Sequence, residues 1–110
     1  MQPLTRVAAV LLVAVAATAT IARAEPLTIV ALGDSLTAGF QLVPGEGIPA
    51  KLQEALAAEG IDVEVSDAGV SGDTTAGGLS RLDWSVGPET DAVIVALGGN
   101  DALRGSAPDE

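Results

Sequence analysis

The stretch TIVALGDSLTAG, residues 28–39, joins a short apolar run to a cluster of small and turn-forming residues. An unbroken apolar run that stops at a glycine is typical of a strand buried on both faces of a parallel sheet. Gly33 permits a sharp turn, and Asp34 and Ser35 are both residues that begin helices by accepting backbone N–H groups. Ser35 is therefore expected where a strand meets a helix, either as a helix cap or as a nucleophile.

The rest of the chain predicts two more strands and two helices. Apolar residues recur at helical spacing over residues 48–59, and residues 79–86 are expected to form a second, shorter helix. Residues 61–66 alternate apolar with polar, whereas residues 91–97 form another continuous apolar run. Strands alternating with helices across short connections predict parallel strands, right-handed crossovers and helices on both faces of the sheet.

Residues 1–24 are expected to be a secretory signal peptide. Arg6 supplies a basic start, residues 7–22 are nearly all apolar, and Ala22-Arg23-Ala24 fits a small-x-small cleavage site. A membrane anchor is the alternative, but the apolar run is shorter than the roughly 20 residues of a spanning helix. Cleavage would leave one domain, residues 25–110, in the periplasm or outside the cell, with no stable membrane span.

The composition argues against a nucleic-acid partner. The 110 residues carry a formal charge of −10, and without Arg6 and Arg23 only three basic side chains face fifteen acidic ones. A polyanion would be repelled, and no basic patch interleaved with aromatic residues is present to overcome the repulsion. The chain has no cysteine, so disulfides do not stabilise it, and no histidine.

Each expected strand is followed by a small, polar segment that contains glycine, namely residues 33–35, 69–74 and 98–101. Parallel strands place all three at one end of the sheet, where open α/β sheets bind ligands. A serine there can attack an ester carbonyl if donors stabilise the oxyanion. The candidate donors are the N–H groups of Ser35 and Gly72 and the amide of Asn100. A plain turn at Gly72 and an Asx turn at Asn100 are the alternatives.

Three ordered blocks then resemble the SGNH (GDSL-type) hydrolases: GDSLTAG at 33–39, GVSGDTTAGGL at 69–79 and LGGNDALRG at 97–105. The match is closest to the secreted bacterial arylesterase, lysophospholipase and acyl-CoA thioesterase branch. The resemblance implies a flavodoxin-like three-layer α/β/α fold with a parallel sheet. It also implies that Ser35 is the nucleophile, that the Gly72 backbone and Asn100 side chain complete an oxyanion hole, and that no cofactor or metal takes part. The implied substrate is a small acyl ester or thioester.

The sequence departs from the family pattern in two places. Asp67 stands where relatives usually have asparagine, and the Asp-x-x-His block is missing from residues 1–110. We therefore expect residues 25–110 to be the N-terminal part of a hydrolase domain, truncated on its C-terminal side. Residues 106–110 are expected to begin a helix. Because a serine hydroxyl without a base is a weak nucleophile, this chain alone is expected to be nearly inactive.

Two other classes of function stay open. Asp34, Asp73 and Asp101 all follow expected strands, so a magnesium-dependent phosphoryl-transfer site is conceivable. A non-catalytic protein that binds acyl ligands is the other alternative, favoured by the missing histidine. Residues 33–39 fit neither a P-loop nor a dinucleotide-binding fingerprint.

The remaining side chains have ordinary expectations. A solvated helix face is predicted for Lys51, Glu54 and Glu59, and surface ion pairs are predicted for Arg81 and Arg104. The residues expected to face inward from the second helix are Leu79, Leu82 and Val86, with Trp84 packed against the sheet. The residues expected either in the core or in an acyl pocket near Ser35 are Leu42, Val43 and Ile48.

Overall fold

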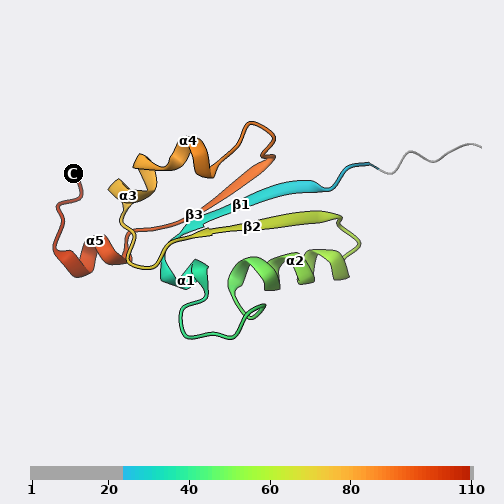
Figure 1. Cartoon of the computed structure of the whole chain (residues 1–110), viewed down its shortest axis with the longest axis horizontal. Helices are drawn as coiled ribbons and strands as arrows, with labels where there is room; N and C mark the ends of the chain where they lie inside the picture. Colours follow the sequence, from blue (N-terminus) through green and yellow to red (C-terminus); the bar gives the residue numbers. More distant parts are fainter. Residues whose placement is uncertain (1–23, 110) are drawn as a thin grey trace, which may run out of the picture.

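The computed structural model describes residues 24–109, so the expected signal peptide lies, except for Ala24, outside the described residues. Its centre is a parallel sheet with the strand order β2-β1-β3 (Figure 1). The strands are β1 (Leu27–Gly33), β2 (Val63–Gly69) and β3 (Ala92–Ala96). The helices are α1 (Ser35–Ala38), α2 (Ile48–Ala58), α3 (Thr75–Ser80), α4 (Leu82–Ser85) and α5 (Gly99–Arg104).

The helices form a layer on each face of the sheet. Figure 1 shows α1 and α2 on one face, α3 and α4 on the other, and α5 beyond the carboxyl ends of the strands. This arrangement confirms the predicted α/β class, the parallel pairing and the helices on both faces.

The central strand β1 sets the level at which all three strands end. Gly33, its last residue, is paired with Gly69 of β2 on one side and with Ala96 of β3 on the other. Both neighbouring strands therefore stop beside Gly33. The segments that follow the three strands therefore leave the sheet at the same end, as the sequence predicts.

The main packed core lies between the sheet and α2. Ala31, Val63 and Val65 are buried there and contact Leu52 and Leu56 of the helix. These two leucines lie four residues apart, on one face of a helix. The opposite face of α2 carries Lys51 and Glu54, which are exposed and paired at 3.0 Å, and Glu59, just beyond the helix, is also exposed. The predicted solvated face is confirmed.

The second face of the sheet is less well covered, and three predictions about it are wrong. Leu79 and Trp84 are 72% and 76% exposed, rather than facing inward or packing against the sheet. The expected single helix is broken at Arg81 into α3 and α4. Leu82 and Val86, the other two residues expected to face inward, are half-buried.

The strand β3 forms where it is expected but is not buried. All five of its residues are exposed, with Val95 65% exposed. It is paired with β1 along one edge only. A continuous apolar run therefore predicts the strand correctly but not its burial.

The C-terminal end of the described chain also differs from expectation. The helix α5 follows β3 directly and ends at Gly105, whose φ of 72° is left-handed. Residues 106–109, expected to begin a helix, are not helical. The sequence does not indicate α5, because Gly98 and Gly99 stand at its start and glycine is a poor helix former.

Within residues 24–109, no helix combines the length and the apolar character that crossing a bilayer requires.

Candidate active site

Ser35 is the first residue of α1 and lies immediately beyond the end of β1. The residue before it, Asp34, is buried, and its Oδ1 accepts a hydrogen bond of 3.0 Å from the Leu36 N–H. Asp34 is therefore the helix cap, and Ser35 is not needed for that role. Ser35 is half-buried. Its backbone N–H lies at the start of the helix, where N–H groups lack partners within the helix.

Close packing of α1 on the neighbouring strand depends on Gly69. A Cβ at this position would overlap the backbone of Ala38 and come within 2.9 Å of the Asp34 carbonyl oxygen. Only glycine therefore fits, and its absent side chain lets the turn that carries Ser35 lie against the end of β2.

Gly72 lies in the loop that follows β2. Its φ of 82° is in the left-handed region that favours glycine. Its carbonyl oxygen accepts a hydrogen bond of 2.7 Å from Nη2 of Arg104, in α5. Earlier in the loop, the Val70 N–H donates to the Gly33 carbonyl oxygen at 3.0 Å. The loop is thus fastened both to the end of β1 and to α5.

Asn100 lies in the first turn of α5. Its Nδ2 donates to the Asp73 carbonyl oxygen at 2.8 Å, so the amide contacts the residue that follows Gly72. This partner lies 27 residues away in sequence, so the amide nitrogen makes a contact between segments, whereas an Asx turn would use the amide oxygen. The residue before Asn100, Gly99, lies close to Asp34: a Cβ placed on Gly99 would lie 3.9 Å from Oδ2 of Asp34.

The structure thus brings the three predicted segments together at the carboxyl end of the sheet. Direct hydrogen bonds join the Gly72 loop to Asn100 and to the end of β1, and Gly99 lies beside the Asp34–Ser35 turn.

The prediction that Arg81 pairs on the surface is wrong. Arg81 is 9% exposed, and its Nε donates to Oδ2 of Asp73 at 2.7 Å. Its Nη2 donates to the Gly33 carbonyl oxygen at 3.1 Å, and its Nη1 donates to the Ser85 hydroxyl at 3.2 Å. Arg104 is exposed, but its partner is the Gly72 carbonyl rather than a carboxylate. The sequence does not indicate the role of Arg81, because two of its partners, Asp73 and Gly33, lie in other segments of the chain.

Asp101 fastens α5 to the start of α3. Its carboxylate accepts a hydrogen bond of 2.6 Å from the Thr75 hydroxyl and one of 3.0 Å from the Thr75 N–H. These bonds, the hydroxyl's above all, lower the pKa of Asp101 below its usual value of 3.8.

The three aspartates after the strands do not form a shared cation site. Asp34 caps α1, Asp73 pairs with Arg81, and Asp101 binds Thr75. No three acidic residues of the described part of the chain are grouped so that they could hold a metal ion. The magnesium alternative therefore gains no support from this geometry.

Asp67, the residue that replaces the usual asparagine, makes a local hydrogen bond. Its Oδ1 accepts from the Gly69 N–H at 2.8 Å. A carboxylate oxygen can accept such a bond as an amide oxygen does, so this interaction does not require asparagine.

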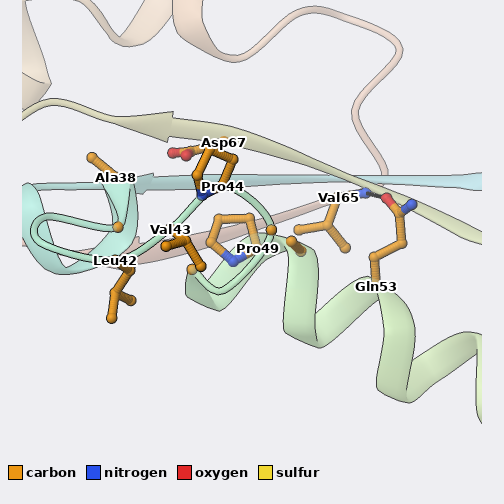
Figure 2. Close-up of a pocket in the computed structure, with 12 residues that line it drawn as sticks. Ala38, Leu42, Val43, Pro44, Pro49, Gln53, Val65 and Asp67 are labelled. Atoms are coloured by element: carbon orange, nitrogen blue, oxygen red, sulfur yellow. Dashed lines mark hydrogen bonds between the residues drawn. The ribbon is translucent and has the colours of Figure 1, made fainter.

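A cavity of about 490 Å³ lies beside α1, between the loop of residues 39–47, the start of α2 and β2. Figure 2 shows Val43 and Pro49 on one side of it, with Val65 and Asp67 on the strand. Leu42 also lines the cavity, whereas Ile48 does not, and all three expected pocket residues are exposed rather than in the core. Ala38 links the cavity to α1, but Ser35, Gly72 and Asn100 do not line it.

Known proteins are similar to this chain in both sequence and fold. The model of the GDSL-like Lipase/Acylhydrolase family matches residues 31–110. Esterase TesA of Pseudomonas aeruginosa is 47% identical over 87 residues, which cover 78% of this chain and 43% of that protein. An arylesterase of Vibrio mimicus is 46% identical over 78 residues, covering 70% of this chain and 39% of the relative.

Among solved structures, AlinE4, an SGNH-hydrolase family esterase, superposes with a TM-score of 0.74 at 48% identity. The match covers 80% of this chain and 48% of AlinE4. The chain thus spans less than half the length of these relatives. From the match over residues 31–110, the chain belongs to the GDSL-like lipase/acylhydrolase family.

Proposed function

We propose that this chain carries the nucleophile and the oxyanion donors of a serine-dependent site for small acyl esters or thioesters. The observation that carries the proposal is the hydrogen bond from the Asn100 amide to the Asp73 carbonyl. It holds the amide against the Gly72 loop, at the edge of the sheet where β1 delivers Ser35. Membership of a family that includes esterases supports the same chemistry.

In the proposed reaction, Oγ of Ser35 attacks the acyl carbon as its proton passes to a base, and the carbonyl oxygen becomes an oxyanion. Collapse of the oxyanion breaks the bond from the acyl carbon to the alkoxide or thiolate, which leaves, and the acyl group stays on Ser35. The N–H groups of Ser35 and Gly72 donate to the oxyanion. The Asn100 amide has two hydrogens, so one can hold the Asp73 carbonyl while the other donates to the oxyanion. Each donor of this kind contributes about 10²–10³ to the rate in a serine hydrolase.

The serine proton needs a base that residues 1–110 do not provide as an imidazole, because the sequence contains no histidine. In a serine protease, loss of the histidine costs about 10⁶ in turnover, while the oxyanion hole and substrate binding retain about 10³–10⁴ over water. We therefore propose that this chain alone turns over esters very slowly. An acyl group transferred to Ser35 would then remain there, because its hydrolysis needs the same base.

The proposed substrates share an acyl group and differ in the group that leaves. Esters and thioesters generate the same oxyanion, so the donors described above serve both. The cavity beside α1 is a candidate site for part of the substrate, because Ala38 connects it to the helix that Ser35 begins, and Leu42 and Val43 line it.

Acylation of Ser35 tests the proposal directly. After the chain is incubated with p-nitrophenyl acetate at pH 9, intact mass and peptide mapping should find one acetyl group on Ser35. The Ser35→Ala variant should lose the label, and Ser66→Ala, which changes an exposed serine on β2, should retain it. Ester turnover that survives Ser35→Ala would contradict the site. Saturable binding of the ester with no acylation would favour the acyl-binding alternative.

We also propose that residues 1–24 direct export and are then removed, which places the domain in the periplasm or outside the cell. The basic start, the apolar run and the Ala-x-Ala site support this. N-terminal sequencing of the exported protein should begin at Glu25.

A further inference from the structure

One buried guanidinium contacts both of the segments that the proposed oxyanion hole requires. Nη2 of Arg81 donates to the carbonyl of Gly33, two residues before Ser35, and Nε donates to Asp73, one residue after Gly72. The Asp73 carbonyl, in turn, accepts from the Asn100 amide. Arg81 is thus connected to the neighbours of Ser35 and Gly72 and, through Asp73, to Asn100.

We propose that Arg81 is a positioning residue, which holds the Gly72 N–H and the Asn100 amide at a fixed place relative to Ser35. The inference rests on the proposed function. It gives Arg81 no contact with the substrate, since its donors point to the protein.

The burial of Arg81 supports a role other than simple stabilisation. The side chains of Arg81 and Asp73 are only 10% and 13% exposed. Removing two charges from water is costly, and apolar residues of similar volume often stabilise a protein as well as a buried ion pair does. What an apolar side chain does not supply is a set of directed bonds to β1, to the Gly72 loop and to α4.

The planar guanidinium suits this task better than an ammonium group. Its nitrogens form a rigid fork, and here Nε, Nη1 and Nη2 each point to a different acceptor. A lysine at this position can pair with Asp73 as a point charge. It lacks the fork that bonds the Gly33 carbonyl and the Asp73 carboxylate at the same time.

The position of the Gly72 loop matters because oxyanion stabilisation is geometric. Donors must lie about 2.7–3.1 Å from the place that the oxyanion occupies. A displacement of about 1 Å can lower the rate about 100-fold. Loss of the bonds from Arg81 is therefore expected to slow the chemical step on Ser35 while leaving ligand binding unchanged.

The test measures covalent labelling of Ser35 by an alkyl fluorophosphonate in the full chain at pH 9. Mass spectrometry at several probe concentrations separates the limiting labelling rate from the probe's apparent dissociation constant. For Arg81→Gln and Arg81→Lys we expect the limiting rate to fall about 10- to 100-fold, by the same geometric argument, with the dissociation constant unchanged.

Leu82→Ala is the matched control, because Leu82 is half-buried among apolar side chains and makes none of these polar bonds. This variant is expected to lose stability but keep the labelling rate. Arg81→Lys keeps a charge beside Asp73, so it decides the question if Arg81→Gln does not fold. Amide NMR gives a second readout: the Gly72 N–H signal of the labelled chain should move downfield in the wild type and less in Arg81→Lys.

The outcomes separate the two hypotheses. If the wild type labels on Ser35 and both arginine variants label at the same limiting rate, the role of Arg81 is wrong and the proposed nucleophile stands. An equal loss of rate in Leu82→Ala would also overturn it, because destabilisation would then explain the effect. If the wild type does not label on Ser35, the proposed function fails, and the positioning role fails with it.

Discussion

Asp34, Asp73 and Asp101 each follow a strand of the sheet, but the structure gives them three different partners. Asp34 binds a backbone N–H of its own helix, Asp73 pairs with a buried arginine, and Asp101 accepts two hydrogen bonds from Thr75. The hydrogen bonds from Thr75 lower the pKa of the Asp101 carboxyl. This pKa therefore offers a test of the contact between α5 and α3 at a single residue.

We predict that this contact weakens in acid. The pKa of Asp101 is lowered in the folded chain below its usual 3.8, so the bonds to Thr75 contribute their full stability above that pH. The contribution is lost as the pH falls through the lowered pKa, because protonation removes the charge that Thr75 stabilises. A carboxyl ¹³C NMR titration should report this pKa, and the Thr75 amide signal should follow the same curve.

Thr75→Val is the control for that titration, because it removes the hydroxyl and keeps the backbone N–H. In this variant the pKa of Asp101 should rise toward 3.8. A pKa unchanged by the substitution would mean that the Thr75 hydroxyl does not bind the carboxylate in solution.

At the scale of elements, β1 is the central strand of the sheet, and the sequence signal that predicts it is local. The apolar run and the Gly-Asp-Ser turn lie within a few residues of each other, so the sequence alone indicates the strand, the turn and the short helix. The same is true of α2, whose buried and exposed faces follow helical spacing. The prediction for Arg81 failed because it depends on contacts made far along the chain.

Arg81 is the clearest example of such a failure. Its partners Asp73 and Gly33 lie eight and 48 residues away. No spacing rule connects a basic residue to a carbonyl in another element. Arg81 lies at the break between α3 and α4.

The unequal burial of the strands predicts unequal effects of identical substitutions. Val65 of β2 is 9% exposed and packs against α2, whereas Val95 of β3 is 65% exposed. Val65→Ala should lower the free energy of unfolding by about 2 kcal/mol, through lost apolar contacts and a residual cavity. Val95→Ala should change it by less than about 0.5 kcal/mol, as is usual at exposed sites.

Urea denaturation followed by circular dichroism measures both variants. The two midpoints should differ. The dependence of the free energy of unfolding on urea concentration should stay the same, because the substitutions hardly change the surface area that unfolding exposes. Equal destabilisation by the two substitutions would contradict the exposure of β3.

At the scale of the whole molecule, the topology turns three separate segments into one candidate site. Parallel strands that end beside Gly33 deliver Ser35, Gly72 and Asn100 to the same edge, and this follows from the order of strands and helices in the sequence. The family blocks indicate the same three residues. Their convergence on one oxyanion stays a prediction, which acylation of Ser35 tests.

The exposure of β3 leads to the last prediction, which concerns the chain as a unit. An edge strand has one row of backbone groups without strand partners, and all five residues of β3 are exposed. Amide hydrogens in such a strand exchange through smaller openings than those in a central strand. Exchange measured by NMR or mass spectrometry should therefore give protection that falls from β1 to β2 to β3.

The same measurement repeated at several protein concentrations shows whether β3 stays uncovered. Protection of β3 that rises with concentration, while that of β1 does not, would show that a second copy covers the strand in solution. Protection of β3 equal to that of β1 at every concentration would contradict its place at an open edge. The predicted gradient, independent of concentration, is what a single chain with β1 at the centre of its sheet requires.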